Sequence, residues 1–451
     1  MYIKNQEELL DHGDVALRKQ LIDAIEYALE YVDPYLRTRE LVKLNHDLLS
    51  IGDLEFDLKR VRRLCVIGAG KATYPIAKAL EEILSEHISE GLVIVREDET
   101  RKLSRVKVVQ AGHPIPNEAG FKAAQEIVRI ASDSKKDDLF LVAFTGGCSA
   151  LMPYPVEGVT LEDKRRITSL LLGCGATITE INSVRKHLSR TKGGGLAKKM
   201  APATIVNLTV SDVIGDPLDC ITDPTVTDPS TFDEARTTLN KYDLWEAIPE
   251  SARNYLSNAS PNQETLKDYG DLRIRTFVIA NNVMAAEVAL SHLYARGFNS
   301  RILTTSLEGE SREVGYALAA IMSEMAKYGR PLQTPAAIIC AGETVVKLED
   351  ESNFGKGGPS QELAAAVALR LPRDSKVAGV FLDTDGSDGP TNFAGGLVDS
   401  STVKRAEAQG IDIYSSLKEH KISTVFQKLG DGIRTGATGT NVMDLSILIA
   451  E

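Results

Sequence analysis

Three glycine-bearing polar stretches near the end of the chain are its strongest chemical signal. They cover residues 355–362, 383–390 and 438–441, and each is read as a loop that follows a predicted strand. Loops at strand ends are where open α/β sheets bind ligands. This pattern predicts a phosphoryl-transfer enzyme.

The second of these loops carries three carboxylates, Asp383, Asp385 and Asp388. Their spacing loosely resembles a cation site, but Gly386 occupies the wrong place for an EF-hand loop. Turns in which an Asp side chain accepts a backbone N–H are the alternative for at least one of them.

A predicted strand, a glycine turn and a helix start surround Lys71. The ammonium would lie beside backbone N–H groups at a helix N-terminus, which suits a phosphate or a carboxylate. The segment is not a P-loop, because Cys65 stands where that motif needs glycine, and Thr73 breaks the dinucleotide fingerprint. A tight turn with an exposed lysine is the alternative.

Gly146 and Gly147 end another predicted strand, and such small residues let a ligand approach the backbone closely. A structural turn is the alternative. Cys148 follows, yet no His or Asp neighbours it in sequence, which disfavours a nucleophilic thiol.

Basic residues gather at Arg185, Lys186, His187 and Lys192, and a glycine run at 193–195 follows them. Local positive charge in an acidic chain indicates phosphate binding. The alternative is a solvated helix face, and His187 is better explained as a structural hydrogen-bonding residue.

Asp212 follows the predicted strand at residues 204–210. A carboxylate at this place could orient an attacking hydroxyl or hold Mg²⁺. Capping of the next turn is the alternative.

The elements that must position these residues alternate along the chain. Leu17, Leu21, Ile25 and Leu29 recur at helical spacing, so the first 60 residues are predicted to be helical. Short apolar runs then alternate with amphipathic stretches, which indicates a doubly wound parallel sheet. The predicted strands cover residues 64–67, 91–95, 106–109, 139–144 and 204–210.

A polar stretch around Pro261 predicts the domain boundary, with domains at residues 1–261 and 262–451. The length favours two sizeable α/β domains with a cleft between them. The second sheet is predicted to contain residues 276–280, 301–305, 337–340, 377–382 and 442–449.

The formal net charge of −11 argues against nucleic acid or an anionic membrane as a partner. No run approaches the ~18 apolar residues of a membrane span, and the start shows no secretory leader. Five dispersed cysteines without CxxC spacing favour free thiols and a cytoplasmic protein.

Taken in order, these segments resemble the glycerate 2-kinase family, whose C-terminal part is called the MOFRL domain. The resemblance rests on residues 68–71, 112–116, 184–189 and 192–194 and on the late glycine loops. It implies a Rossmann-like first domain, a mixed-sheet second domain, ATP with Mg²⁺, and phosphorylation of the 2-hydroxyl of D-glycerate. A homodimer stays open.

The resemblance implies the catalytic residues, and the kinase hypothesis built on it assigns the other roles. The catalytic pair would be Lys71 and Asp212, and the substrate would be bound by Ser149, Arg185 and Lys186. Nucleotide binding would fall to Gly146, Gly147, Lys192, Gly193, Gly194, Gly357, Gly358, Asp385 and Gly389. The metal would be held by Asp385 and Asp388.

The chain departs from the family pattern at three places. Pro359 stands where members usually have an arginine, Cys148 interrupts a glycine-serine run, and residues 222–225 read Thr-Asp-Pro-Thr instead of Ser-Gly-Pro-Thr. Either Arg185 or Lys356 replaces the arginine, or the acceptor is a different hydroxy or sugar acid. A hydroxypyruvate reductase and a non-catalytic sugar-acid sensor also stay open as functions.

Overall fold

The computed structural model describes residues 1–348 and 355–451 of the chain. The chain divides into two compact units, one of residues 34–279 and one of residues 1–33 with 280–451. The cleft expected between two domains stays a prediction.

The unit of residues 34–279 is built on a six-stranded sheet with the order β6-β5-β4-β7-β8-β9. Its strands are β4 (Arg63–Ala69), β5 (Ile88–Arg96), β6 (Lys107–Ala111), β7 (Asp138–Phe144), β8 (Thr204–Val210) and β9 (Arg273–Ala280). The pairs from β6 to β8 are parallel. Counted along the chain this order is 3-2-1-4-5-6, so the predicted Rossmann-like sheet is confirmed.

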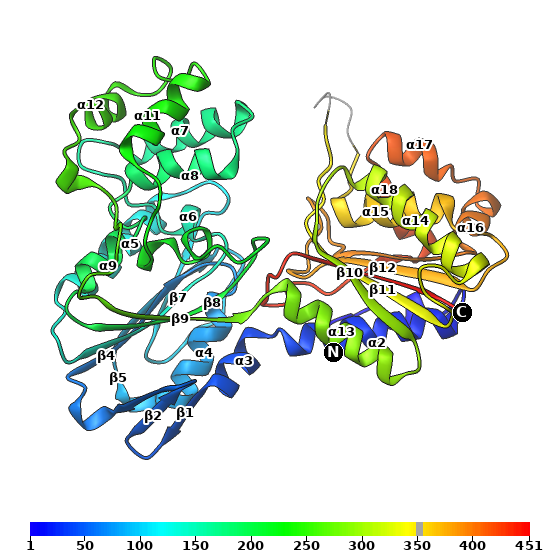
Figure 1. Cartoon of the computed structure of the whole chain (residues 1–451), viewed down its shortest axis with the longest axis horizontal. Helices are drawn as coiled ribbons and strands as arrows, with labels where there is room; N and C mark the ends of the chain where they lie inside the picture. The colour runs from blue at the N-terminus through cyan, green and yellow to red at the C-terminus, as the bar shows by residue number, and fades with distance from the viewer. Residues whose placement is uncertain (349–354) are drawn as a thin grey trace. The chain divides into compact units, whose positions relative to one another are not determined.

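Helices cover both faces of this sheet (Figure 1). Helix α4 (Thr73–Leu84) packs on one face, and α5 (Glu118–Ser132) with α9 (Gly195–Met200) packs on the other. Because both faces are covered, β7 is buried along its whole length. The continuous apolar runs of the sequence are explained by this burial.

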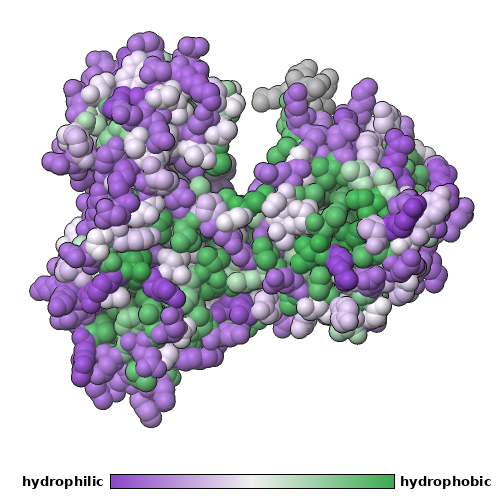
Figure 2. Space-filling view, viewed as in Figure 1, coloured by the Kyte–Doolittle hydropathy of each residue, from purple (hydrophilic) through white to green (hydrophobic). Residues whose placement is uncertain are grey.

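Four helices form a separate layer of the same unit with a core of their own. They are α7 (Leu161–Gly173), α8 (Ile178–His187), α11 (Phe232–Lys241) and α12 (Glu250–Asn258). Thr160 and Thr177 begin α7 and α8 with capping boxes, which satisfy N–H groups at each start. Hydrophilic side chains cover most of the visible face of this layer (Figure 2).

Residues 42–57, expected to be helical, form a small antiparallel sheet instead. Its strands are β1 (Val42–Asn45), β2 (Leu48–Ile51) and β3 (Leu54–Asp57). Two-residue turns join them, with φ of 53° at His46 and 56° at Gly52. Positive φ at such positions matches the twist of hairpin strands, and this turn chemistry overrides the helical expectation.

The other unit contains a mixed six-stranded sheet with the order β10-β11-β15-β12-β13-β14. Its strands are β10 (Asn299–Leu307), β11 (Ala336–Gly342), β12 (Val377–Asp383), β13 (Gly395–Asp399), β14 (Gly432–Ile433) and β15 (Asp444–Ala450). Only β10 and β11 pair in parallel among its described strands. The mixed sheet expected for the second domain is confirmed.

Helices also cover both faces of this second sheet (Figure 1). Helices α2 (Val15–Tyr31) and α13 (Asn282–Ala295) pack together on one face. The other face is covered by α14 (Ser311–Tyr328), α15 (Pro359–Arg370), α16 (Thr402–Ala408), α17 (Ile413–Lys418) and α18 (Ile422–Leu429). The remaining short helices are α1 (Gln6–Leu9), α3 (Pro34–Leu41), α6 (Cys148–Leu151) and α10 (Leu218–Ile221).

The division of the chain differs from the boundary expected near Pro261. Leu266, beyond that proline, is buried in the core of the first sheet, and β9 joins this sheet as its last strand. The first 33 residues belong to the other unit, where Arg18 of α2 is ion-paired with Asp399 and Asp431. The polar stretch around Pro261 is a surface loop within one unit and not a linker between domains. Composition could not separate the two, because loops inside a domain are as polar as linkers.

No helix in the described parts of the chain is long and apolar enough to cross a membrane.

Candidate active site

The strand order reverses between the neighbouring strands β4 and β7. Open α/β sheets bind ligands outside the carboxyl ends of their strands at such a point. The segments that leave these strands are Gly70-Lys71 after β4 and Thr145-Gly146-Gly147 after β7. Two of the candidate ligand-binding turns of the sequence therefore meet at the place where this fold binds ligands.

Hydrogen bonds connect the segment after β4 directly to the segment after β7. The backbone N–H of Lys71 donates to the carbonyl of Gly146 at 2.8 Å, and that of Ala72 donates to Oγ1 of Thr145 at 3.1 Å. Gly70 has a φ of 147°, and a Cβ atom there would lie 2.0 Å from Oγ1 of Thr145. Glycine is needed at this position for the segments to touch.

Asp212, which follows β8, lies against the same turn. A Cβ atom at Gly146 would be 1.8 Å from Oδ2 of Asp212. A Cβ atom at Gly147, where φ is 85°, would be 3.3 Å from Cγ of Lys71 and 3.1 Å from Nε2 of His113. The predicted catalytic residues Lys71 and Asp212 thus lie on either side of the double glycine, with His113 beside them.

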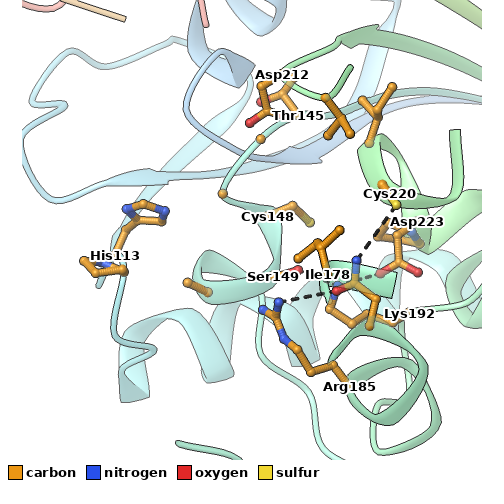
Figure 3. A pocket seen from close by; sticks show the side chains of 18 of the residues that line it. His113, Thr145, Cys148, Ser149, Ile178, Arg185, Lys192, Asp212, Cys220 and Asp223 are labelled. Atoms are coloured by element: carbon orange, nitrogen blue, oxygen red, sulfur yellow. Dashed lines mark hydrogen bonds and ion pairs between the residues drawn. The ribbon is translucent and has the colours of Figure 1, made fainter. Parts of the chain in front are cut away.

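A cavity of about 310 Å³ opens at this turn. Thr145 and Asp212 line one end of it, and Arg185, Lys192 and Asp223 line the other (Figure 3). Cavities of this size bind small molecules. The pocket combines a carboxylate beside a glycine turn with a cationic end.

The cationic end is fixed by Lys192. Its ammonium donates to Oγ of Ser149 at 2.6 Å and to Oδ2 of Asp223 at 2.5 Å. The N–H groups of Gly193 and Gly194 donate to Asp223 as well, to its carboxylate and its carbonyl. These amides, predicted to bind a nucleotide, hold Asp223 in this structure.

The basic residues of α8 diverge, because successive residues of a helix point about 100° apart. Arg185 lines the pocket (Figure 3). Lys186 is buried and is ion-paired with Asp219 at 2.8 Å and Asp228 at 3.1 Å. The structure therefore brings Arg185, but not Lys186, into the pocket with Ser149.

His187 turns into the helical layer. Its Nδ1 donates to the carbonyl of Ser183 at 2.6 Å, and its Nε2 lies 3.0 Å from Oε2 of Glu264. Both ring nitrogens are engaged, so the structural interpretation of this histidine is confirmed.

Cys148 is the first residue of the short helix α6 and lines the pocket. Burial raises the pKa of its thiol to about 12. The thiol stays protonated near neutral pH, which argues against a nucleophilic role.

Asp388 caps helix α15 in the other unit. Its carboxylate accepts from the backbone N–H groups of Ser360 at 3.0 Å and Gln361 at 2.8 Å. A Cβ atom at Gly358 would lie 2.3 Å from its Cγ, so glycine permits this approach. Burial raises the pKa of Asp388 to about 6. The carboxylate oxygens of Asp388, which were predicted to bind a metal, accept hydrogen bonds from the first turn of α15.

The neighbouring loop residues have structural contacts of their own. Asp385 accepts from the N–H of Ser387 at 2.9 Å, which is the turn geometry of an Asp side chain. Gly389 has a φ of 62°, and a Cβ atom there would lie 2.5 Å from the carbonyl oxygen of Gly357. Within residues 1–348 and 355–451, no group of three or more His, Cys, Asp or Glu side chains could hold a metal ion.

Three residues at the pocket carried no predicted role. His113 lies within residues 112–116, which contribute to the family resemblance, and Asp223 stands at one of the departures from the family pattern. Lys164 is buried with Ile167 and Leu171 on α7, one turn before Thr168, which lines the pocket. A lysine at the apolar spacing of an amphipathic helix was the signal that could have found it.

Comparisons with known proteins show the family of the chain. A domain of unknown function, DUF4147, matches residues 20–257, and the MOFRL family matches residues 336–444. The glycerate 2-kinase of Pyrococcus horikoshii is 41% identical over 94% of this chain and 94% of its own length. The crystal structure of a glycerate kinase from Thermotoga maritima has a TM-score of 0.85 and 36% identity, covering 97% of this chain and 100% of that one.

A further relative, from Agrobacterium vitis, bears the name putative hydroxypyruvate reductase. It is 36% identical over 86% of this chain and 99% of its own length.

The first sheet has the Rossmann strand order, with a cationic pocket where that order reverses, and the second sheet is the mixed sheet of the MOFRL part. These features define the class of small-molecule kinases to which the relatives belong. The chain belongs to the glycerate 2-kinase family.

Proposed function

We propose that the chain transfers the γ-phosphoryl group of ATP to the 2-hydroxyl of D-glycerate and releases 2-phosphoglycerate. Relatives that match nearly the whole chain carry glycerate kinase names. The observation that carries the proposal is the placement of Lys71 and Asp212 on either side of the Gly146-Gly147 turn, next to a cationic pocket.

In this mechanism the substrate spans the pocket. Arg185 and Lys192 bind its carboxylate, and Ser149, which already accepts from Lys192, orients that end. Asp212 at the other end accepts a hydrogen bond from the 2-hydroxyl and takes its proton as the oxygen attacks. Lys71 stabilises the negative charge that develops on the transferring group.

Arg185 can also take the role of the arginine that family members usually have where this chain has Pro359. The planar guanidinium binds a carboxylate through two parallel hydrogen bonds, which a lysine cannot do. Since Arg185 lines the pocket, we assign the carboxylate contact to it and not to Lys186, whose charge two aspartates already balance.

ATP supplies the phosphoryl group when bound. The close approach that Gly146 and Gly147 allow, together with the charge of Lys71, fits a phosphate chain. Mg²⁺ is usually held by one or two carboxylates with substrate phosphates. We therefore propose that Mg²⁺ enters bound to ATP. For Gly357, Gly358, Asp385 and Gly389 of the other unit, nucleotide contact remains the proposal that the sequence makes.

The test is a coupled assay of ADP release with D-glycerate, followed by phosphorus NMR of the product. Lys71→Met should lower kcat about 1,000-fold with an unchanged melting temperature, since electrostatic stabilisation of this kind is worth about 10²–10³ or more. Arg166→Met, an exposed residue of α7, serves as the control. Near-normal turnover by Lys71→Met would remove this lysine from the mechanism.

Hydroxypyruvate reduction is the second candidate, because the Agrobacterium vitis relative bears that name. Thr73 breaks the dinucleotide fingerprint after β4, which argues against it. Mixing the chain with hydroxypyruvate and NADH and following NADH absorbance decides between the two reactions. A panel of three- to six-carbon hydroxy acids identifies a different acceptor, and binding without ADP release would indicate a sensor.

We place the protein in the cytoplasm, because its five cysteines are all free. A homodimer is the assembly to test, by light scattering of the purified chain.

A further inference from the structure

Lys164 has an unusual environment for a lysine. The residue is 5% exposed, and its Nζ has no hydrogen-bond partner among the described residues. It lies on α7 one turn before Thr168, which lines the active-site pocket. A buried ammonium is costly unless an opposite charge lies beside it.

The charged groups near enough to act electrostatically on Lys164 come from three other elements. They are Arg185 of α8, Lys192 of the loop before α9, and Asp223 of the 3₁₀ turn Asp223–Thr225. All three line the pocket (Figure 3). Asp223 already accepts from Lys192 and from the N–H of Gly193, and Nε of Arg185 also lacks a partner among the described residues. This end of the pocket therefore carries more positive than negative charge.

Other buried lysines of this unit are balanced within the protein. Lys186 is paired with Asp219 and Asp228, and Lys192 is paired with Asp223. An apolar residue at position 164 would pack on this helix face without a desolvation penalty. Packing of the fold therefore does not explain why position 164 carries an amine, but binding of an anion in the pocket explains it.

We propose that Lys164 is a substrate-binding residue that, with Arg185 and Lys192, holds the carboxylate of the acceptor. This assignment rests on the proposed function and extends its binding site by a residue behind the pocket wall.

Proton uptake should accompany binding at this site. Burial, with the charges of Lys192 and Arg185, lowers the pKa of Lys164 to about 7. A carboxylate beside the amine favours the charged form, so binding above pH 7 takes up a proton. The thiol of Cys148, which Lys192 and Arg185 also face, has a pKa of about 12 and stays protonated in this range.

The experiment compares the wild-type chain with Lys164→Met and the control Arg166→Met, a charge removed from the exposed face of the same helix. Steady-state kinetics give KM for D-glycerate and for ATP separately between about pH 6.5 and 9, which brackets the pKa of a buried amine. Titration calorimetry with D-glycerate at about pH 8.5, in two buffers of different ionisation enthalpy, counts the protons taken up.

We expect Lys164→Met to raise KM for D-glycerate about 10- to 100-fold, the value of a hydrogen bond to a charged group, with KM for ATP unchanged. Proton uptake should fall from nearly one to nearly zero. Melting curves identify a variant that fails to fold, and Lys164→Arg, which keeps the charge, should then restore part of the affinity. Unchanged KM and proton uptake in Lys164→Met would overturn the proposal.

Two further measurements distinguish failure of the proposed kinase function from failure of the proposed role of Lys164. If the wild-type chain binds hydroxy acids without phosphorylating them, the proposed function fails, yet weaker acid binding by Lys164→Met still supports the site. If the variant instead loses binding of inorganic phosphate or raises KM for ATP alone, Lys164 contacts phosphate and the carboxylate assignment is wrong. A wild-type chain that binds none of these acids overturns both proposals.

Discussion

The carboxylate of Asp212 lies directly against the α-carbon of Gly146, so closely that a methyl group at position 146 would stand 1.8 Å from Oδ2. The glycine turn between β7 and α6 therefore fixes the position of the carboxylate at the strand end after β8. A carboxylate that accepts a proton in phosphoryl transfer must be held within a fraction of an ångström.

Gly146→Ala should displace Asp212 while leaving the sheet intact, because the clash falls on the end of a side chain. We expect kcat to fall about 100-fold, the effect of a misplacement of about 1 Å at a reacting centre. Gly173→Ala is the control, since nothing lies within 4 Å of a Cβ atom there. Wild-type kcat in Gly146→Ala, measured by ADP release, would show that the position of Asp212 is not critical.

The ion pair of Lys192 with Asp223 should stabilise the pocket wall. Both side chains are nearly buried, and Asp223→Ala leaves the ammonium with Ser149 as its remaining hydrogen-bond partner among the described residues. Removing one partner of a buried pair costs about 3–5 kcal/mol. Urea unfolding should show this loss in Asp223→Ala and a smaller one in the double variant Lys192→Met with Asp223→Ala. Equal losses in the two variants would mean that the unpaired Lys192 ammonium carries no penalty in Asp223→Ala.

The turns of the active site could be predicted because their chemistry is local. Gly70-Lys71 and Gly146-Gly147 each follow an apolar run, and parallel strands place their carboxyl ends at one edge of the sheet. Their meeting at β4 and β7 depends on strand order, which only the folded sheet shows.

Other features depend on contacts between distant parts of the chain. Lys186 was expected beside Arg185, but the helical rotation between neighbours sends it to Asp219 and Asp228. The apolar spacing of α7 could have indicated that Lys164 is buried, but only the folded chain shows which charged groups lie near it. Local patterns predict which residues are available, while tertiary packing decides which of them meet.

Lys164 should also make stability depend on pH in a characteristic direction. Its folded pKa of about 7 lies below the value of 10.5 for a free lysine. Below pH 7 the amine is charged in both states, so the penalty of burial is complete. Between these values the unfolded chain binds a proton that the folded chain does not, so stability rises with pH by up to about 1.4 kcal/mol per unit.

Lys164→Met lacks this penalty, so its melting temperature should exceed that of the wild type most at about pH 6 and progressively less toward about pH 9. Differential scanning calorimetry across this range measures the gap, with Arg166→Met as the control. A gap that widens with pH would contradict the lowered pKa.

Arg18 should be the residue that fastens the N-terminal helix α2 to the MOFRL-containing unit. Its fully buried guanidinium lies 2.5 Å from Oδ2 of Asp399 and 2.8 Å from Oδ1 of Asp431. Arg18→Met leaves these carboxylates buried with less compensation, and we expect it to lose about 3–5 kcal/mol at neutral pH. Arg296→Met, which removes a half-exposed pair with Asp23, should lose less than about 1 kcal/mol.

The ion pair of Arg18 with Asp399 also predicts how the free energy of unfolding changes at acidic pH. Although burial opposes ionisation, the Arg18 charge and hydrogen bonds from Ser401 and Arg18 lower the pKa of Asp399 to about 2, against 3.8 for a free aspartate. This depressed pKa contributes stability above about pH 4 that is lost as pH falls toward 2. The stability difference between the wild type and Arg18→Met should therefore shrink as pH falls, because the Asp399 carboxylate, left buried without Arg18 in the variant, takes up a proton at a higher pH than in the wild type. Urea unfolding at each pH measures it, and a difference that persists to about pH 2 would show that Arg18 acts through packing and not through the charge of Asp399.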